Sequence, residues 1–230
     1  MRILTDLFDS QNRQDTLLVL LPPAESRIED FISKGFVDAV RSCHIRTDIF
    51  LAEVTHQHVM SKTIVSALHE HVMQRALASG YQKIWFAGIS LGAFNALFYA
   101  SEYAKHLAGI YLIAPYPGTG DILAEIIGAG GAANWTHTQS TNRNDERAWW
   151  HWISQESAAG QWSTPVYLGT GTEDRFLRGQ RMLAELLPSE NVRMISGTHS
   201  WPTWIALWHE WLESAPLACQ TPHASVAFIK

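Results

Sequence analysis

The stretch KIWFAGISLGAFNALFYASEYA, residues 83–104, decides how the rest of this 230-residue chain is interpreted. It opens with the apolar run KIWFA, which has the length and the β-favouring side chains of a buried strand. The five residues GISLG come next, and a run of helical composition follows them. The stretch therefore predicts a strand, a tight turn and a helix, with Ser90 at the turn.

The spacing of Gly88, Ser90 and Gly92 fits a special kind of turn. So sharp a reversal strains the backbone of the serine, and it leaves room only for glycine-sized residues two positions before and two after it. Ser90 would then project at the head of the helix, where the N–H of Leu91 points outward and the helix dipole favours a developing negative charge. The alternative is a plain glycine-rich turn in which Ser90 caps the helix.

Apolar runs of strand length recur along the chain, and segments with helical spacing lie between them. This alternation predicts an α/β protein with a mostly parallel central sheet of about six or seven strands and helices on both faces. Residues 61–79 predict one of the helices, which ends at Gly80. The predicted strands are residues 16–21, 48–54, 83–87, 109–114, 166–169 and 192–195, with residues 2–8 as a weaker edge strand.

Residues 116–164 break the alternation of strands and helices. A structureless loop of that length would be unusual in a compact domain, so this segment predicts a helical insertion over one edge of the sheet, between the strands at 109–114 and 166–169. We expect a single domain over residues 1–215, including this insertion, and a C-terminal tail over residues 216–230.

The overall composition excludes several classes of protein. With 47% hydrophobic and 17% charged residues, the chain is globular rather than disordered. Its formal charge of −5 argues against nucleic acid as the main partner. Asp6 and Asp9 interrupt the apolar start that a signal peptide needs, and no apolar run reaches the roughly 18 residues of a membrane span. We therefore expect a cytoplasmic protein without membrane insertion.

The two cysteines, Cys43 and Cys219, lie far apart and lack the CxxC spacing of a zinc or redox site. This pattern predicts neither a structural metal nor a disulfide framework. We expect both side chains to be buried as small hydrophobic groups.

Two segments after late predicted strands complete the pattern. GTED, residues 171–174, follows the strand VYLG, and GTHSW, residues 197–201, follows the strand VRMIS. Together with the GxSxG turn, they resemble the α/β-hydrolase superfamily, in which serine, acid and histidine occur in that order along the chain. The resemblance spans about residues 16–212 and points to a small serine esterase or thioesterase.

This resemblance implies a catalytic triad of Ser90, Asp174 and His199. The hydroxyl of Ser90 would be the nucleophile, the imidazole of His199 its base, and the carboxylate of Asp174 the group that orients the imidazole. Glu173 is an alternative acid. Asp174 could also serve only as the cap of the helix that follows it.

The resemblance also implies an oxyanion hole with two backbone donors. Leu91 would supply one of them, and the loop after the strand at 16–21 the other. Family members commonly place His-Gly at the start of this loop, whereas this chain has Pro22 and Pro23, neither of which has an N–H. The second donor is therefore expected at Ala24 or at Glu25.

Ten tryptophans are a high number for this length. Trp201, Trp204, Trp208 and Trp211 are spaced as a helical stripe, which predicts core packing for most of them. We expect Trp201 to form a wall of the site, since it lies two residues from His199. Five more lie in the insertion, where Trp149, or alternatively Trp150 or Trp152, is expected to contact substrate; such flat apolar walls suit an aliphatic or aromatic group.

The expected function is that of a serine hydrolase. It would cleave a small carboxylic ester or thioester that carries an apolar group, through an acyl-enzyme on Ser90, with no metal and no organic cofactor. The alternatives are a hydrolase-shaped binding protein without turnover, or the same triad used for acyl transfer or C–C bond hydrolysis.

Overall fold

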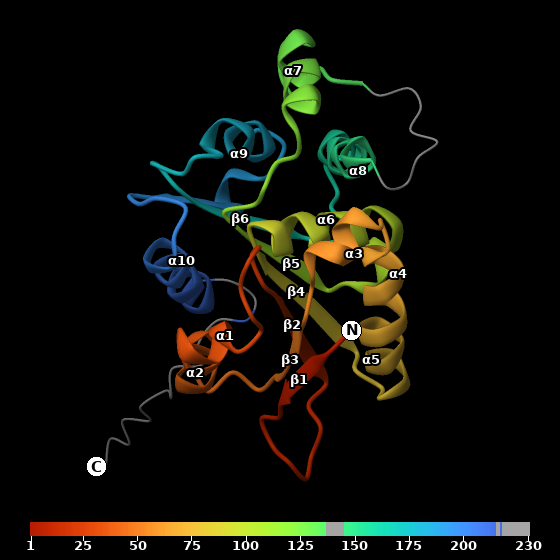
Figure 1. Ribbon diagram of the computed structural model, residues 1–230, viewed down its shortest axis with the longest axis vertical. Helices are drawn as coiled ribbons and strands as arrows, with labels where there is room; N and C mark the ends of the chain where they lie inside the picture. Colours follow the sequence, from red (N-terminus) through yellow and green to blue (C-terminus); the bar gives the residue numbers. More distant parts are fainter. Residues whose placement is uncertain (137–144, 215–216, 218–230) are drawn as a thin grey trace, which may run out of the picture.

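The computed structural model of the chain describes residues 1–136, 145–214 and 217 (Figure 1). Seven strands form one sheet in the order β1-β3-β2-β4-β5-β6-β7. β1 pairs with β3 in the antiparallel sense, and all the other neighbours are parallel. The strands are β1 (Ile3–Asp6), β2 (Thr16–Leu21), β3 (Asp48–Ala52), β4 (Lys83–Ile89), β5 (Gly109–Ile113), β6 (Val166–Gly171) and β7 (Val192–Ile195).

The sheet explains why the strands appear in the sequence as short continuous apolar runs. Every residue of β3 and β5 is buried, because each of these strands has covered neighbours on both sides and a helical layer on both faces. The seven predicted strands are all confirmed, with ends that move by up to two residues. The weak edge strand is real but short, and it is the only antiparallel member.

Helices cover both faces of the sheet, as expected (Figure 1). One face carries α1 (Asp30–Ser33), α2 (Phe36–Ser42) and α10 (Trp201–Ser214), whose apolar side chains share one core cluster with that side of the strands. The other face carries α4 (Ile64–Leu68), the π-helical η1 (His69–Met73), α5 (Gln74–Ala78) and α6 (Leu91–Tyr103). Shorter elements are α3 (His56–Met60) and the 3₁₀ turns η2 (Ala104–His106) and η3 (Ser189–Asn191).

The helix predicted at 61–79 occurs as α4, η1 and α5, which follow one another without a break from residue 64 to residue 78. Gly80 follows with a φ of 80°, a left-handed conformation that ends the helix at little cost for a glycine.

The predicted insertion is helical. It contains α7 (Gly120–Gly128) and α8 (Glu146–Ala159), and α9 (Leu177–Ala184) follows β6. α8 packs on α6, which lies over the central strands β2, β4 and β5, so the expected position over one edge of the sheet is wrong for this helix. Of the tail predicted at 216–230, only Leu217 lies within the described residues, and it is buried.

Cys43, at the C-terminal end of α2, is half-buried, so the expectation of a buried side chain is wrong for this residue. Cys219 lies outside the described residues. Within the described ranges, none of the helices has both the length and the apolar character needed to cross a membrane.

Candidate active site

Ser90 occupies the turn between β4 and α6 with φ 52° and ψ −108°, a conformation that non-glycine residues avoid. Hydrogen bonds on both sides hold this turn. The Ser90 N–H donates to the carbonyl of Ile113 at 2.8 Å, and the Ser90 carbonyl accepts from the N–H groups of Phe94 at 3.1 Å and Tyr116 at 3.2 Å. The strain at Ser90 is thus fixed by its neighbours in β5 and α6, as the sequence predicted for the turn.

The two glycines of the turn have no room for a side chain. A Cβ on Gly88 would lie 2.4 Å from the carbonyl carbon of Gly92, and a Cβ on Gly92 would lie 2.1 Å from the carbonyl oxygen of Leu21. Both distances are far shorter than any real contact of that kind, and the steric expectation for this motif is confirmed. The second contact also shows that the first turn of α6 lies directly against the end of β2.

The structure brings Ser90, His199 and Asp174 into one hydrogen-bonded chain. The Nε2 of His199 lies 2.9 Å from the Oγ of Ser90, and its Nδ1 lies 2.7 Å from the Oδ2 of Asp174. A neutral imidazole with its proton on Nδ1 donates to the carboxylate and accepts from the hydroxyl, so one tautomer satisfies both contacts. The side chain of His199 is 7% exposed and that of Asp174 is 0% exposed.

The neighbouring acidic residue is arranged differently. Glu173 is exposed and accepts a hydrogen bond from the hydroxyl of Ser196 at 3.2 Å, away from the imidazole. Asp174 uses its two oxygens separately, because Oδ1 accepts from the backbone N–H of Phe176 at 2.8 Å while Oδ2 faces His199. The N-cap of α9 is Phe176 and has no side-chain cap hydrogen bond, so the alternative in which Asp174 caps this helix is wrong; its Oδ1 instead holds the turn before α9.

Aromatic rings surround the imidazole. Phe176 and Trp204 meet His199 edge to face, with ring centroids 5.0 Å and 5.1 Å away. Tyr116 lies between Phe176 at 5.2 Å and Phe94 at 5.3 Å. Burial, and secondarily the charge of Glu146, raise the pKa of the Tyr116 phenol above its usual value, so this ring is a neutral wall.

Sequence reasoning missed most of this aromatic lining. Tyr116 lies three residues after the end of β5 and Phe176 five residues after the end of β6. This position after a strand end was the sequence feature that could have indicated a place in the site. Trp204 was assigned to core packing; it is buried, but one edge also contacts His199.

The two predicted tryptophans differ in their surroundings. Trp149 is fully buried, stacks on Trp150 with centroids 4.7 Å apart, and meets Phe94 at 6.2 Å. Trp149 lines neither of the two pockets described below and packs against Phe94, so its contact with substrate stays a prediction. Trp201 is half-buried and packs against Trp204 at 5.2 Å, behind the ring that faces His199.

The predicted oxyanion donors lie on neighbouring segments. Leu91 is the first residue of α6, where an N–H has no partner within the helix, and its side chain is half-buried. Ala24 and Glu25 lie in an exposed turn after β2, and Glu25 has a φ of 60°. Since the end of β2 touches Gly92, this turn starts beside the first turn of α6.

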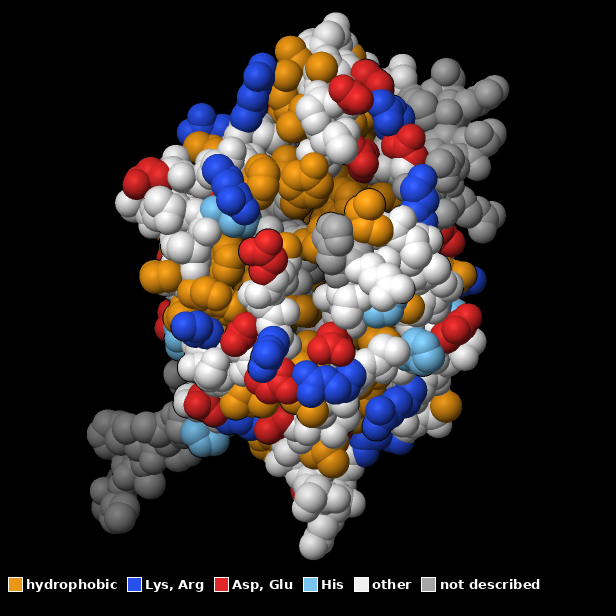
Figure 2. Space-filling view, in the orientation of Figure 1, with side chains coloured by type: hydrophobic (Ala, Val, Ile, Leu, Met, Phe, Trp, Pro, Cys, Tyr) orange, Lys and Arg blue, Asp and Glu red, His pale blue; other side chains and the backbone are white. Residues whose placement is uncertain are grey.

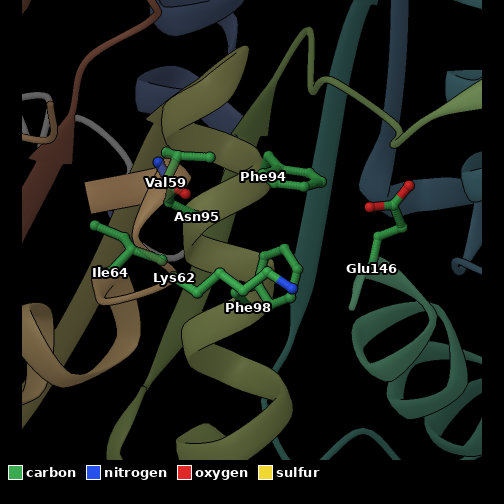
Figure 3. Close-up of a pocket in the computed structure, with 7 residues that line it drawn as sticks. All are labelled: Val59, Lys62, Ile64, Phe94, Asn95, Phe98 and Glu146. Atoms are coloured by element: carbon green, nitrogen blue, oxygen red, sulfur yellow. The ribbon is translucent and has the colours of Figure 1, made fainter. Parts of the chain in front are cut away.

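Two pockets are lined by members of this aromatic group, one by Tyr116 and Phe176 and the other by Phe94. One, of about 370 Å³, is bounded by Tyr116, Leu123 and Phe176 with Arg175 and Arg178 at its rim. Figure 2 shows hydrophobic side chains gathered on this face below α7 and between α8 and α9. The other pocket, of about 180 Å³, lies against α6 and is lined by Val59, Lys62, Ile64, Phe94, Asn95, Phe98 and Glu146 (Figure 3).

A metal centre has no support in the part of the chain that the structure describes, where no group of three or more His, Cys, Asp or Glu side chains could hold an ion. His58, which follows β3, has a structural use, because its Nδ1 accepts from the N–H of Thr55 at 3.1 Å in a capping box at the start of α3. Burial lowers the pKa of His58, which favours the neutral form that this contact needs.

Comparisons with known proteins agree with this arrangement at the level of fold. No protein-family model matches the chain, and no curated protein matches its sequence. Many solved structures do resemble it. They include the fluorophosphonate-binding serine hydrolase F of Staphylococcus aureus, with a TM-score of 0.63 and 13% identity over 90% of this chain and 89% of that one.

Two further similar structures are an S-formylglutathione hydrolase of Staphylococcus aureus and Est1E of Butyrivibrio proteoclasticus. The first has a TM-score of 0.61 and 11% identity over 90% of this chain and 87% of its own. The second has a TM-score of 0.60 and 15% identity over 92% of this chain and 90% of its own. With its mostly parallel seven-stranded sheet, helices on both faces and these likenesses, the chain has the α/β-hydrolase fold.

Proposed function

We propose that the chain is a serine hydrolase that cleaves small carboxylic esters or thioesters through an acyl-enzyme on Ser90. One observation carries the proposal, namely the hydrogen-bond chain in which His199 lies 2.9 Å from the Ser90 hydroxyl and 2.7 Å from the Asp174 carboxylate. The similar structures named as serine hydrolases, and one described with ferulic acid bound, support the reaction class and a small-molecule ester as substrate.

The chemistry follows from these contacts. As the Oγ of Ser90 attacks the substrate carbonyl, the Nε2 of His199 takes its proton, and Asp174 stabilises the imidazolium that forms. The imidazolium then gives the proton to the leaving alkoxide or thiolate as the tetrahedral intermediate collapses to the acyl-enzyme. Water, deprotonated by His199, attacks the acyl-enzyme; the acid leaves and Ser90 regains its proton.

The carbonyl oxygen gains negative charge in both tetrahedral intermediates. We propose the N–H of Leu91 as one donor to this oxygen, because it begins α6 beside Ser90 and has no acceptor within the helix. The N–H of Ala24, or that of Glu25, is the proposed second donor. Removing one such donor lowers the rate by about 2.7–4 kcal/mol of transition-state stabilisation in comparable sites.

Apolar groups on the substrate fit the surroundings of the reacting atoms. Tyr116, Phe94 and Phe176 provide flat apolar walls. The pocket lined by Tyr116 and Phe176 and the pocket lined by Phe94 offer separate places for the acyl and the alcohol or thiol parts. Trp201 contributes by holding Trp204 against the imidazole.

Hydrolysis of a series of p-nitrophenyl esters of increasing acyl length tests the proposal, with Ser90→Ala as the matched variant. We expect turnover by the parent chain, loss of turnover in the variant, and labelling of the parent alone by a fluorophosphonate probe, which transfers its phosphonyl group to the serine oxygen and releases fluoride. Equal rates in the two proteins would remove Ser90 from the mechanism. Absence of both turnover and labelling would favour a binding protein that uses the fold without catalysis.

A further inference from the structure

Asn95 is an unusual residue of α6, which is buried over residues 92–100. Its side chain is 0% exposed, yet neither its Oδ1 nor its Nδ2 has a hydrogen-bond partner among the described residues. A buried polar group without a partner is costly, and native proteins rarely leave both ends of an amide unpaired. Asn95 also lines a pocket, and a ligand group bound there would complete its hydrogen bonds.

The amide belongs to the wall of the 180 Å³ pocket, which is otherwise mostly apolar (Figure 3). Phe94 and Phe98 form one side, with their rings 4.9 Å apart in an edge-to-face contact. Val59 and Ile64 belong to the opposite side, contributed by α3 and α4. A ligand in this pocket would therefore meet apolar surface everywhere except at Asn95 and at the charged rim.

The charged residues of the rim are Lys62 and Glu146 (Figure 3). Lys62 is exposed, and the carboxylate of Glu146 accepts a hydrogen bond from the N–H of Thr119 at 2.7 Å. Glu146 thus has a partner within the protein, in contrast to the amide of Asn95.

The position of the pocket on α6 connects it to the reacting serine. Residues 91, 94, 95 and 98 lie on one face of a helix, since their spacing of three and four residues matches its period. Asn95 lies five residues beyond Ser90, which corresponds to about 7.5 Å along the helix axis. A group of the size of a ring with one or two linking carbons spans that distance.

The volume points to the same size of ligand. A dry apolar cavity of about 150 Å³ is known to hold one benzene molecule. The pocket here has about 180 Å³, enough for one six-membered ring with a small substituent.

We propose that this pocket receives a ring on the ester substrate that carries a hydroxyl group, and that Asn95 is the residue that selects it. The hydroxyl donates to Oδ1 and accepts from Nδ2, so one small group satisfies both unpaired atoms. Phe94 and Phe98 hold the faces and edges of the ring. The inference deepens the proposed hydrolase function and rests on it.

Matched ester pairs test the inference on the unaltered protein. For the alcohol side we would compare 4-hydroxyphenyl acetate with 4-methylphenyl acetate, and for the acyl side ethyl 3-(4-hydroxyphenyl)propanoate with ethyl 3-(4-methylphenyl)propanoate. Methyl and hydroxyl have similar size, so the pairs differ mainly in hydrogen bonding. We expect kcat/KM to favour the hydroxyl ester by about tenfold or more in one of the two orientations.

The variant Asn95→Leu is the matched control, because it has a similar volume and no polar atoms. It is expected to abolish the preference of kcat/KM for the hydroxyl ester over the methyl ester. Equal kcat/KM values for hydroxyl and methyl esters in both orientations of the parent would overturn the role of Asn95 while leaving the proposed hydrolase intact.

Binding of 4-hydroxyphenylacetamide and 4-methylphenylacetamide, measured by ligand-observed NMR with Ser90→Ala, gives a second readout that needs no turnover. Tighter binding of the hydroxyl compound supports the inference even if the esters are poor substrates, and equal binding opposes it. If no ester is hydrolysed in a Ser90-dependent way, the proposed hydrolase function is wrong. The binding measurement then still tests whether the pocket selects a hydroxyl group.

Discussion

Gly92→Ala is the sharpest perturbation of the turn that carries Ser90. The new Cβ would lie 2.1 Å from the carbonyl oxygen of Leu21, where ordinary contact begins at 3.4 Å. The Cβ is fixed to the backbone of α6 and the oxygen belongs to the backbone of β2, so neither can turn aside, and α6 and the end of β2 must separate by roughly 1 Å or more. Overpacking of this kind costs about 3 kcal/mol, which lowers the melting temperature of a chain of this length by roughly 6–12 °C.

The same displacement moves the serine relative to its partners. A shift of about 1 Å at a reacting group lowers the rate by roughly a hundredfold, so ester hydrolysis should fall even in the fraction that folds. Urea unfolding and p-nitrophenyl ester turnover, normalised to folded protein, measure the two effects separately.

Gly128→Ala provides the control for this prediction. Gly128 ends α7, is exposed, and a Cβ there would meet nothing within 4 Å. Alanine is expected to be neutral or to stabilise by about 0.5–1 kcal/mol, with full activity. If Gly92→Ala were as stable and as active as Gly128→Ala, the steric account of the turn would be refuted.

Three further predictions concern the site. Asp174→Asn should lower kcat by about 10⁴-fold because the amide no longer holds the required tautomer of the imidazole, whereas Glu173→Gln should retain activity in the same assay. The free energy of unfolding, measured with urea, should be about 1 kcal/mol higher for Ser90→Gly than for Ser90→Ala, because only glycine relieves the strain of the positive φ. Equal free energies of unfolding would argue against strain at this residue. Trp149→Ala should destabilise the fold by about 3–5 kcal/mol in urea, and a change confined to KM would instead indicate contact with substrate.

The sheet could be predicted from the sequence because its signals are local. Each buried strand is a short continuous apolar run. Gly88 and Gly92 occur where the turn at Ser90 has no room for a Cβ, and this requirement is visible within five residues of sequence. The order of Ser90, Asp174 and His199 could be inferred only through a resemblance, since the three side chains meet across sequence separations of up to 109 residues. No local pattern encodes such contacts.

The lining of the site was less predictable for the same reason. The sequence placed the substrate walls on tryptophans because the insertion is rich in them, but bulky rings also fill cores, and Trp149 does so completely. The rings that do surround His199 and Tyr116 come from three separate segments, and only the folded chain brings them together.

A single helix links the proposed catalytic turn to the proposed specificity pocket. α6 is buried all round over residues 92–100, which is the usual sign of a helix inside the core rather than at its surface. Within that run, Tyr99 directs its hydroxyl to His69 at 3.2 Å, and Asn95 is the one amide. A polar residue in so apolar a helix needs a reason, and that was the signal in the sequence that could have pointed to the pocket. Ser90 and Asn95 are fixed to the same rigid helix. A substrate whose hydroxyl group is bound at Asn95 therefore has its scissile carbonyl held at a set distance from the nucleophile, so the contact that selects the substrate also aligns it for the reaction.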